Sequence, residues 1–304
     1  MADLGLQLLA FGWGAIWGSF LNVVIYRLPI DLSVVKPGSH CPACEAPIRW
    51  YDNVPILSYF VLRGRCRRCE TTFSPRYALV EATCAVLSLA LFRASVLPLE
   101  PETLVHGLVM WAWLQVFVYG LIAITFIDLE HLYIPDVISL PLIALGVGGA
   151  FLIPTPAPME HLFGALGAAG FLLLVVGFGW LVFRREAMGM GDVKLLSGLG
   201  AYLGWKALPF ILFASATQAL VAVAIARLYS KVTGRENELT RTTEELDAHF
   251  DEADRYADDL PGRLAVPYGP FLALAALEAL FFGHHLIWDW ADAIVLWLLP
   301  TPDL

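Results

Sequence analysis

Two groups of residues in this chain could do chemistry, a pair of aspartates and a set of four cysteines. Asp128 closes the apolar run 108–127, and Asp192 lies just beyond the apolar run 171–183. A carboxylate at the end of a membrane-length apolar run is costly to bury, so it is a candidate functional residue. Two such carboxylates on one membrane face would suit an aspartic protease. One would activate water, and the other, kept protonated, would polarise the scissile carbonyl.

The neighbours of Asp192 support either catalysis or helix capping. Gly189 and Gly191 lack side chains, so an extended substrate could approach the backbone closely there. Asp192 also fits the N-terminal cap of the next helix, and capping could coexist with catalysis. Lys194 could tune a carboxylate or meet an acidic substrate residue, or it could anchor the helix at the cytoplasmic face.

Other polar residues near the apolar runs have simpler interpretations. Asp136 is the main rival for the first catalytic position, but it follows Ile134-Pro135, where a helix would begin, so we expect it to cap that helix. We expect Asn22 to hydrogen-bond a neighbouring helix. For Glu81 we favour a salt bridge or a side chain that reaches the cytoplasm over a substrate role. Glu130 and His131 are expected to be interfacial polar residues.

The cysteines form two pairs, Cys41-Pro-Ala-Cys44 and Cys66-Arg-Arg-Cys69, separated by 21 residues. Two residues between cysteines let both thiolates turn toward one tetrahedral centre, so the pattern predicts a structural zinc site. Two disulfides or free thiols are the alternatives, and the reducing cytoplasm disfavours disulfides. His40 lies next to Cys41 but is not expected to bind the metal, because four cysteines are available. Cys84 is expected to be a small buried apolar residue.

Long apolar segments surround these candidates. The chain is 58% hydrophobic and 15% charged, with a mean hydropathy of +0.68, which indicates a polytopic membrane protein. Segments of spanning length cover 4–26, 77–97, 104–127, 134–153, 160–183, 207–229 and 266–283, and 193–204 is shorter. Backbone groups in lipid must pair within their own segment. We therefore expect an all-α fold of about eight transmembrane helices.

Basic residues set the expected orientation. The loop 27–76 carries eight Lys and Arg residues, which places it in the cytoplasm and the N-terminus outside. Counting crossings from there puts both Asp128 and Asp192 at the cytoplasmic face. Arg184, Arg185 and Lys194 were not used in this count, and they agree with it. Met1–Leu4 contains no base, so we expect the first run to be retained as a spanning helix.

The expected organisation has five parts. Residues 1–27 form the first transmembrane helix, 28–76 a small zinc-stapled cytoplasmic domain, and 77–229 the transmembrane catalytic core. Residues 230–264 form an acidic cytoplasmic loop; 230–263 hold ten acids against five bases and account for much of the net charge of −9. Residues 265–304 form the last transmembrane helix and an interfacial tail. No basic stripe suggests nucleic-acid binding.

The chain resembles the type IV prepilin peptidases over nearly its whole length. The resemblance is carried by the two cysteine pairs and by Gly18-Ser-Phe-Leu-Asn-Val23, Asn53-Val-Pro-Ile-Leu-Ser-Tyr59, Arg76-Tyr-Ala-Leu-Val-Glu81, Ile127-Asp-Leu-Glu-His131, Ile134-Pro-Asp136, Gly189-Met-Gly-Asp-Val-Lys-Leu195 and Pro267-Tyr-Gly-Pro270. The acidic arm 230–263 is longer than the loop usual there.

The resemblance implies an inner-membrane aspartic endopeptidase of the Gly-x-Gly-Asp type, with Asp128 and Asp192 catalytic. Its substrates would be type IV prepilins and pseudopilins, cut after the terminal glycine of a short basic leader. The new N-terminal amine would then be methylated with S-adenosylmethionine, for which no nucleotide-binding motif identifies a site. The zinc loop and 53–81 are plausible contributors.

Two other functional classes fit parts of the pattern. A transporter or channel could use paired carboxylates to relay protons, but both aspartates are expected at one face, and no inverted repeat is evident. A non-enzymatic scaffold of a secretion system would tolerate the loss of either aspartate.

Overall fold

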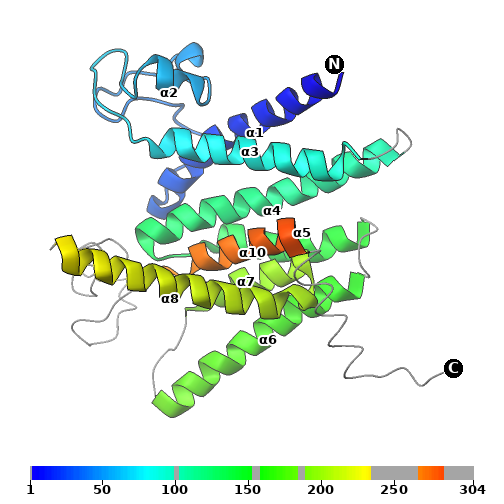
Figure 1. The fold of residues 1–304 in the computed structure, drawn as a ribbon. Coiled ribbons are helices and arrows are strands. Elements are labelled where there is room, and N and C mark those ends of the chain that lie inside the picture. The colour runs from blue at the N-terminus through cyan, green and yellow to red at the C-terminus, as the bar shows by residue number, and fades with distance from the viewer. Residues whose placement is uncertain (1, 99–102, 153–157, 184–188, 234–265, 284–304) are drawn as a thin grey trace. The chain divides into compact units, whose positions relative to one another are not determined.

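The computed structural model describes residues 2–98, 103–152, 158–183, 189–233 and 266–283. Every apolar segment expected from the sequence forms a helix there (Figure 1). These helices are α1 (Ala2–Arg27), α3 (Arg76–Ser95), α4 (Leu104–His131), α5 (Asp136–Leu152), α6 (Pro158–Phe183), α7 (Met190–Leu203), α8 (Leu208–Thr233) and α10 (Gly269–Gly283). No strand occurs in these ranges, so the predicted all-α class is confirmed for them.

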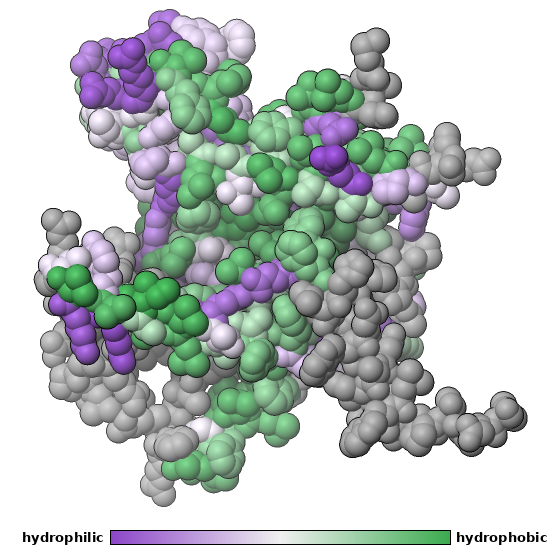
Figure 2. Space-filling view, viewed as in Figure 1, coloured by the Kyte–Doolittle hydropathy of each residue, from purple (hydrophilic) through white to green (hydrophobic). Residues whose placement is uncertain are grey.

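Five of these helices are long and apolar enough to cross a membrane, namely α1, α3, α4, α6 and α8. Large apolar side chains face outward on them; Leu174 and Leu181 of α6, for example, are 75% and 72% exposed. Exposed apolar surface on this scale suits lipid rather than water. Figure 2 shows the same contrast, with apolar helix surfaces and a polar segment around the short helix α2 (Leu57–Val61). The chain is a multi-pass membrane protein, and the count of eight crossings stays a prediction.

The chain folds as two compact units. The first contains Met1–Ile127 and Ala144–Ala157, and the second contains Asp128–Ile143 and Pro158–Leu304. The cysteine loop therefore belongs to the first unit, and both aspartates belong to the second.

In the first unit, α1 and α3 pack directly against each other (Figure 1). Gly14 and Gly18 of α1 make this close packing possible. A Cβ on Gly14 would lie 2.5 Å from the Cys84 carbonyl oxygen, and a Cβ on Gly18 would lie 2.6 Å from the Glu81 Cα. Small residues spaced one turn apart allow helix backbones to approach closely in a membrane. The pair holds the two ends of the cysteine loop on adjacent helices.

Buried polar groups connect α1, α3 and α4 within this unit. The Ser88 hydroxyl donates to the Ala10 carbonyl oxygen at 2.8 Å and accepts from Gln115 Nε2 at 2.9 Å. Trp13 Nε1 in turn donates to Gln115 Oε1 at 2.9 Å. Such bonds satisfy polar side chains that would otherwise lie unpaired in an apolar interior.

In the second unit, α6 and α7 cross at glycines. A Cβ on Gly164 would lie 2.1 Å from the Gly200 carbonyl oxygen, so neither position leaves room for a side chain. Beside the crossing, the ring of His161 is buried with Nδ1 2.9 Å from the Ala201 carbonyl oxygen. Most residues of α7 are buried, although the helix has only 14 residues. The protein interior, rather than lipid, thus surrounds the helix that carries Asp192.

Two expectations concern segments outside the described residues. These are most of the acidic arm 230–263, of which only the first four residues lie in α8, and the interfacial tail 284–304.

Candidate functional site

Asp128 lies in the last turns of α4 and is only 5% exposed. Its Oδ2 accepts the backbone N–H of Gly269, the first residue of α10, at 2.9 Å. A Cβ on Gly269 would lie 2.7 Å from that oxygen. The side chain of Asp128 therefore occupies the space that the glycine leaves free.

Asp192 lies in the first turn of α7. The cap of this helix is Gly189, which has extended backbone angles (φ −68°, ψ 144°) and no side-chain cap bond. The expectation that Asp192 caps the helix is therefore wrong: Asp192 lies three residues further on, inside the helix. An acidic residue there is still favoured by the helix dipole.

The two aspartates lie in the same compact unit. Asp192 lies close enough to Asp128 for their charges to repel each other. Both belong to the second unit, so they share one compact part of the molecule. Two partly desolvated carboxylates at short range hold one proton between them more easily than two charges. An arrangement of this kind can combine one base and one acid in a single site.

The two glycines beside Asp192 differ in their surroundings. A Cβ on Gly191 would lie 3.0 Å from the Ile134 Cβ, so close packing explains this glycine. Gly189 is exposed, and among the described residues a Cβ there would meet only Asp192 Oδ2, at 3.9 Å. Of the two, Gly189 has the open backbone that an extended chain could approach.

Asp136 and Lys194 form an ion pair. Lys194 Nζ lies 2.6 Å from Asp136 Oδ1, and the two side chains are 29% and 55% exposed. The pair connects the start of α5 to α7, a partner for Asp136 that the capping interpretation did not include. Asp136 is more exposed than Asp128 and is tied to a base, which weakens its claim to the first catalytic position.

The four cysteines of the loop converge as expected. Their sulfur atoms all lie within 4.8 Å of one another, and Cys41 Sγ is 3.7 Å from Cys69 Sγ. Zinc–sulfur bonds of about 2.3 Å in a tetrahedron bring sulfurs to about this separation. The donor set and its geometry fit a closed structural zinc site, with no ligand position left for substrate.

The two cysteine pairs are held by equivalent turns. The N–H of Cys41 donates to the Ala46 carbonyl oxygen, and that of Glu45 donates to the Cys41 carbonyl oxygen. The same two bonds recur 25 residues later, where the N–H of Cys66 donates to the Thr71 carbonyl oxygen and that of Glu70 donates to the Cys66 carbonyl oxygen. Glu45 and Glu70 both have positive φ angles, of 54° and 58°. The loop thus presents the same two-cysteine turn twice around one centre.

The close approach of the sulfurs shifts their pKa values in opposite directions. Hydrogen bonds with the side chain and backbone of Thr71 lower the pKa of the Cys69 thiol to about 6. The N–H of Ala46 lowers the pKa of the Cys44 thiol, but burial and hydrogen bonds to the other sulfurs outweigh it and raise that pKa to about 11. Four thiolates this close repel one another unless a metal ion neutralises them.

The remaining sequence candidates have mixed outcomes. Asn22 bonds a neighbouring helix as expected, since its Nδ2 donates to the Tyr77 carbonyl oxygen at 3.0 Å. Cys84 is fully buried, as expected. Glu81 accepts the Ile56 N–H at 2.6 Å and has no ion pair among the described residues, so the salt bridge favoured for it is not found.

Sequence reasoning missed the role of Gly269. Its stretch Pro267-Tyr-Gly-Pro270 carries part of the family resemblance, but nothing in the sequence indicated a bond to Asp128, which is 141 residues away. A glycine between an aromatic residue and a proline is a signal only of unusual local backbone.

Comparisons with known proteins show the family of the chain. Residues 13–94 match the bacterial peptidase A24 N-terminal domain, and residues 115–224 match the type IV leader peptidase family. A prepilin leader peptidase/N-methyltransferase of Myxococcus xanthus is 36% identical over 91% of this chain and 90% of its own length. A protein of the same description from Aeromonas hydrophila is 33% identical over 96% of this chain and 93% of its own length. One from Neisseria gonorrhoeae is 35% identical over 71% of this chain and 80% of its own length. No solved structure matches the chain.

Proposed function

This chain belongs to the type IV leader peptidase family, and we propose that Asp128 and Asp192 are the catalytic pair with which it cuts the leader from type IV prepilins and pseudopilins. The family and the descriptions of the relatives identify an enzyme with protease and methyltransferase activity. The observation that supports the assignment of the pair is that two partly or fully buried carboxylates lie in one compact unit, within the range of electrostatic interaction with each other.

The two aspartates take different roles in hydrolysis. The N–H of Gly269 donates to Asp128, and such a donor suits an ionised carboxylate. We therefore assign Asp128 as the base that takes a proton from water as the water oxygen attacks the scissile carbonyl carbon. Asp192 holds the shared proton and donates it to the carbonyl oxygen. When the carbon–nitrogen bond breaks, Asp128 gives the proton it took from water to the leaving nitrogen, and a hydroxyl of the tetrahedral intermediate returns a proton to Asp192. Water has then been added across the peptide bond, and both aspartates are back in their starting states.

The position of the site suits a membrane-anchored substrate. We propose that the N-terminus lies outside, that residues 28–76 form a cytoplasmic zinc domain, and that 77–229 form most of the catalytic core in an eight-helix inner-membrane protein. The aspartates then lie at the cytoplasmic face, where a substrate helix can arrive laterally and water is available. The exposed backbone at Gly189 is the place where the extended cleavage segment approaches.

Zinc and S-adenosylmethionine are the proposed cofactors. The ligands of the zinc ion are Cys41, Cys44, Cys66 and Cys69, and its role is structural, since a loop of this size has little apolar core of its own. S-adenosylmethionine supplies a methyl group on a sulfonium sulfur for transfer to the new N-terminal amine. Methyl transfer follows cleavage because the amine exists only after the peptide bond is cut.

Cleavage of a prepilin by purified enzyme in detergent or proteoliposomes tests the catalytic pair. Asp128→Asn and Asp192→Asn keep the side-chain size and remove the titrating group, so each should lower cleavage by at least about 10²-fold. Asp136→Asn is the matched control and should cut at close to the wild-type rate. Normal cleavage by either of the first two variants would remove that aspartate from the site, and normal cleavage by both would end the protease assignment.

A further inference from the structure

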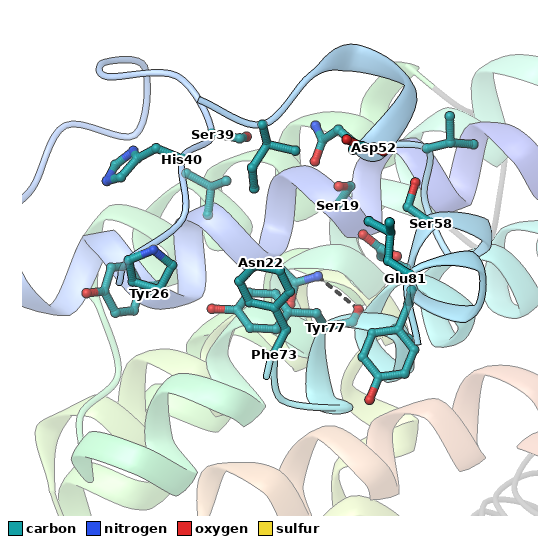
Figure 3. Close-up of a pocket in the computed structure, with 18 of the residues that line it drawn as sticks. Ser19, Asn22, Tyr26, Ser39, His40, Asp52, Ser58, Phe73, Tyr77 and Glu81 are labelled. Atoms are coloured by element: carbon teal, nitrogen blue, oxygen red, sulfur yellow. Dashed lines mark hydrogen bonds between the residues drawn. The ribbon is translucent and has the colours of Figure 1, made fainter. Parts of the chain in front are cut away.

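The first unit contains a cavity of about 460 Å³ that the catalytic pair does not use (Figure 3). It lies between α1, the start of α3 and the cysteine loop, all of which belong to the same unit. Its volume falls within the range of about 300–1,000 Å³ typical of small-molecule sites. The loop wall includes His40 and Pro42 on either side of Cys41, and Arg65 next to Cys66.

Asn22 places an unsatisfied acceptor in this wall. Its side chain is 4% exposed, and its Nδ2 is already used in the bond to the Tyr77 carbonyl oxygen, drawn in Figure 3. Its Oδ1 is buried and has no hydrogen-bond partner in the part of the chain that the structure describes. A buried acceptor without a donor is costly, and few native groups are left in that state. A ligand with an N–H group would satisfy it.

Glu81 adds a negative charge to the same cavity. Its Oε2 accepts the Ile56 N–H, and the carboxylate also shares a hydrogen bond with Ser19. Both partners are neutral, and no base forms an ion pair with Glu81 among the described residues. The other carboxylate of the cavity, Asp52, is held by Arg67 through bonds of 2.6 to 3.0 Å, so its charge is already balanced. Glu81 is therefore the carboxylate that is available to a cationic ligand.

The remaining walls combine aromatic rings with positive charge. Phe73 and Tyr77 line the cavity beside Asn22 in Figure 3, and Tyr59 also contributes. Aromatic faces attract cations and stack on flat heterocycles. Lys36 and Arg65 line the cavity too, and they can meet a ligand carboxylate.

We propose that this cavity binds S-adenosylmethionine, with Asn22 Oδ1 and the Glu81 carboxylate accepting hydrogen bonds from its amino groups. The molecule carries an aromatic base, a sulfonium cation, an ammonium and a carboxylate, which correspond to the four kinds of group in the walls. The identity of the ligand rests on the methyl transfer in the proposed function, whereas its location rests on the cavity alone. Zinc then has a second consequence, because it fixes the loop that forms one wall.

Direct binding tests the location without using activity. The affinity of S-adenosylmethionine for the purified full-length protein in detergent is measured by titration calorimetry. Asn22→Leu removes the free acceptor. Glu81→Gln removes the charge and keeps an oxygen for the Ile56 N–H. Each should weaken binding about tenfold or more. Glu160→Gln is the matched control, since Glu160 pairs with Lys206 in the other unit, and it should bind at wild-type strength.

Zinc content per chain reports whether each variant is folded around the cavity. Wild-type affinity in both cavity variants, with zinc retained, would overturn the location and leave the methyl transfer standing. A wild-type enzyme that cuts prepilin but neither binds the donor nor methylates the product would overturn both.

Discussion

The carboxylate of Asp128 fills the space where Gly269 has no side chain, and it accepts the N–H of that residue at 2.9 Å. The bond joins the last turns of α4 to the first residue of α10. It fixes one member of the proposed catalytic pair by contact with a backbone rather than with another side chain. The position of the carboxylate thus depends on a residue that does no chemistry itself.

Gly269→Ala should displace Asp128 and lower cleavage while the protein stays folded. The new Cβ would lie 2.7 Å from Asp128 Oδ2, and the carboxylate can turn away more easily than the backbone can move. A displacement of about 1 Å can reduce a rate by about 10²-fold. Prepilin cleavage by the variant measures this. Gly167→Ala, where the added Cβ meets nothing within 4 Å, should cut normally. Wild-type cleavage by Gly269→Ala would show that Asp128 does not need this position.

Cys44→Ser should release the metal, and Cys84→Ser should not. Cys44 is one of the four converging sulfurs, whereas Cys84 is buried in α3 against α1. Elemental analysis of the purified wild-type protein should find one zinc ion per chain. The Cys44→Ser variant should lose most of it, and its loop 28–75 should become sensitive to protease. A metal-free wild-type protein with four reactive thiols in this loop would refute the zinc site.

Lys194→Met and Asp136→Asn should have similar and small effects. The two side chains pair at a partly exposed site, where such pairs contribute about 0–1 kcal/mol. In thermal unfolding, the midpoint of the double variant should be no lower than that of the less stable of the two single variants. The Michaelis constant for prepilin separates this role from substrate contact. If Lys194 met the substrate, Lys194→Met alone would raise that constant.

Gly200→Ala should destabilise the second unit. The added methyl would lie 2.3 Å from the Gly164 carbonyl oxygen, and both groups are backbone or fixed to it, so α6 and α7 must separate. Overpacking of this kind costs about 1–3 kcal/mol. Gly170→Ala on α6 meets nothing within 4 Å and should leave the unfolding midpoint unchanged or slightly higher. Equal midpoints for the two variants would argue against a close crossing.

Features that depend on one continuous stretch of chain were predictable. A helix in an apolar environment needs an apolar run, so all eight apolar segments were recognised, with ends displaced by a few residues. The last segment, for example, was expected from residue 266, and α10 begins at Gly269. The turns that hold each cysteine pair were predictable for the same reason, because two cysteines with two residues between them form a local turn. The zinc ion itself stays a prediction.

Features that depend on two distant stretches were not predictable. The bond from Gly269 to Asp128, the pair of Lys194 with Asp136 and the cavity beside Asn22 all require knowledge of which helices pack together. The prediction of the α7 cap was wrong for a different reason. Glycine caps a helix by backbone conformation alone, so Gly189 gives no polar signal in the sequence, and the pattern points to the nearby aspartate instead.

The chain order of the site has a consequence for biosynthesis. Asp128 emerges early from the ribosome, Asp192 follows, and the N–H that fixes Asp128 arrives only with α10, 141 residues after it. A nascent chain inserted up to α8 therefore carries both carboxylates but lacks the backbone that aligns one of them. With Asp128 and Asp192 as the proposed catalytic pair, proteolysis would require α10. An incomplete copy left in the bilayer would then be a poor enzyme rather than an uncontrolled one.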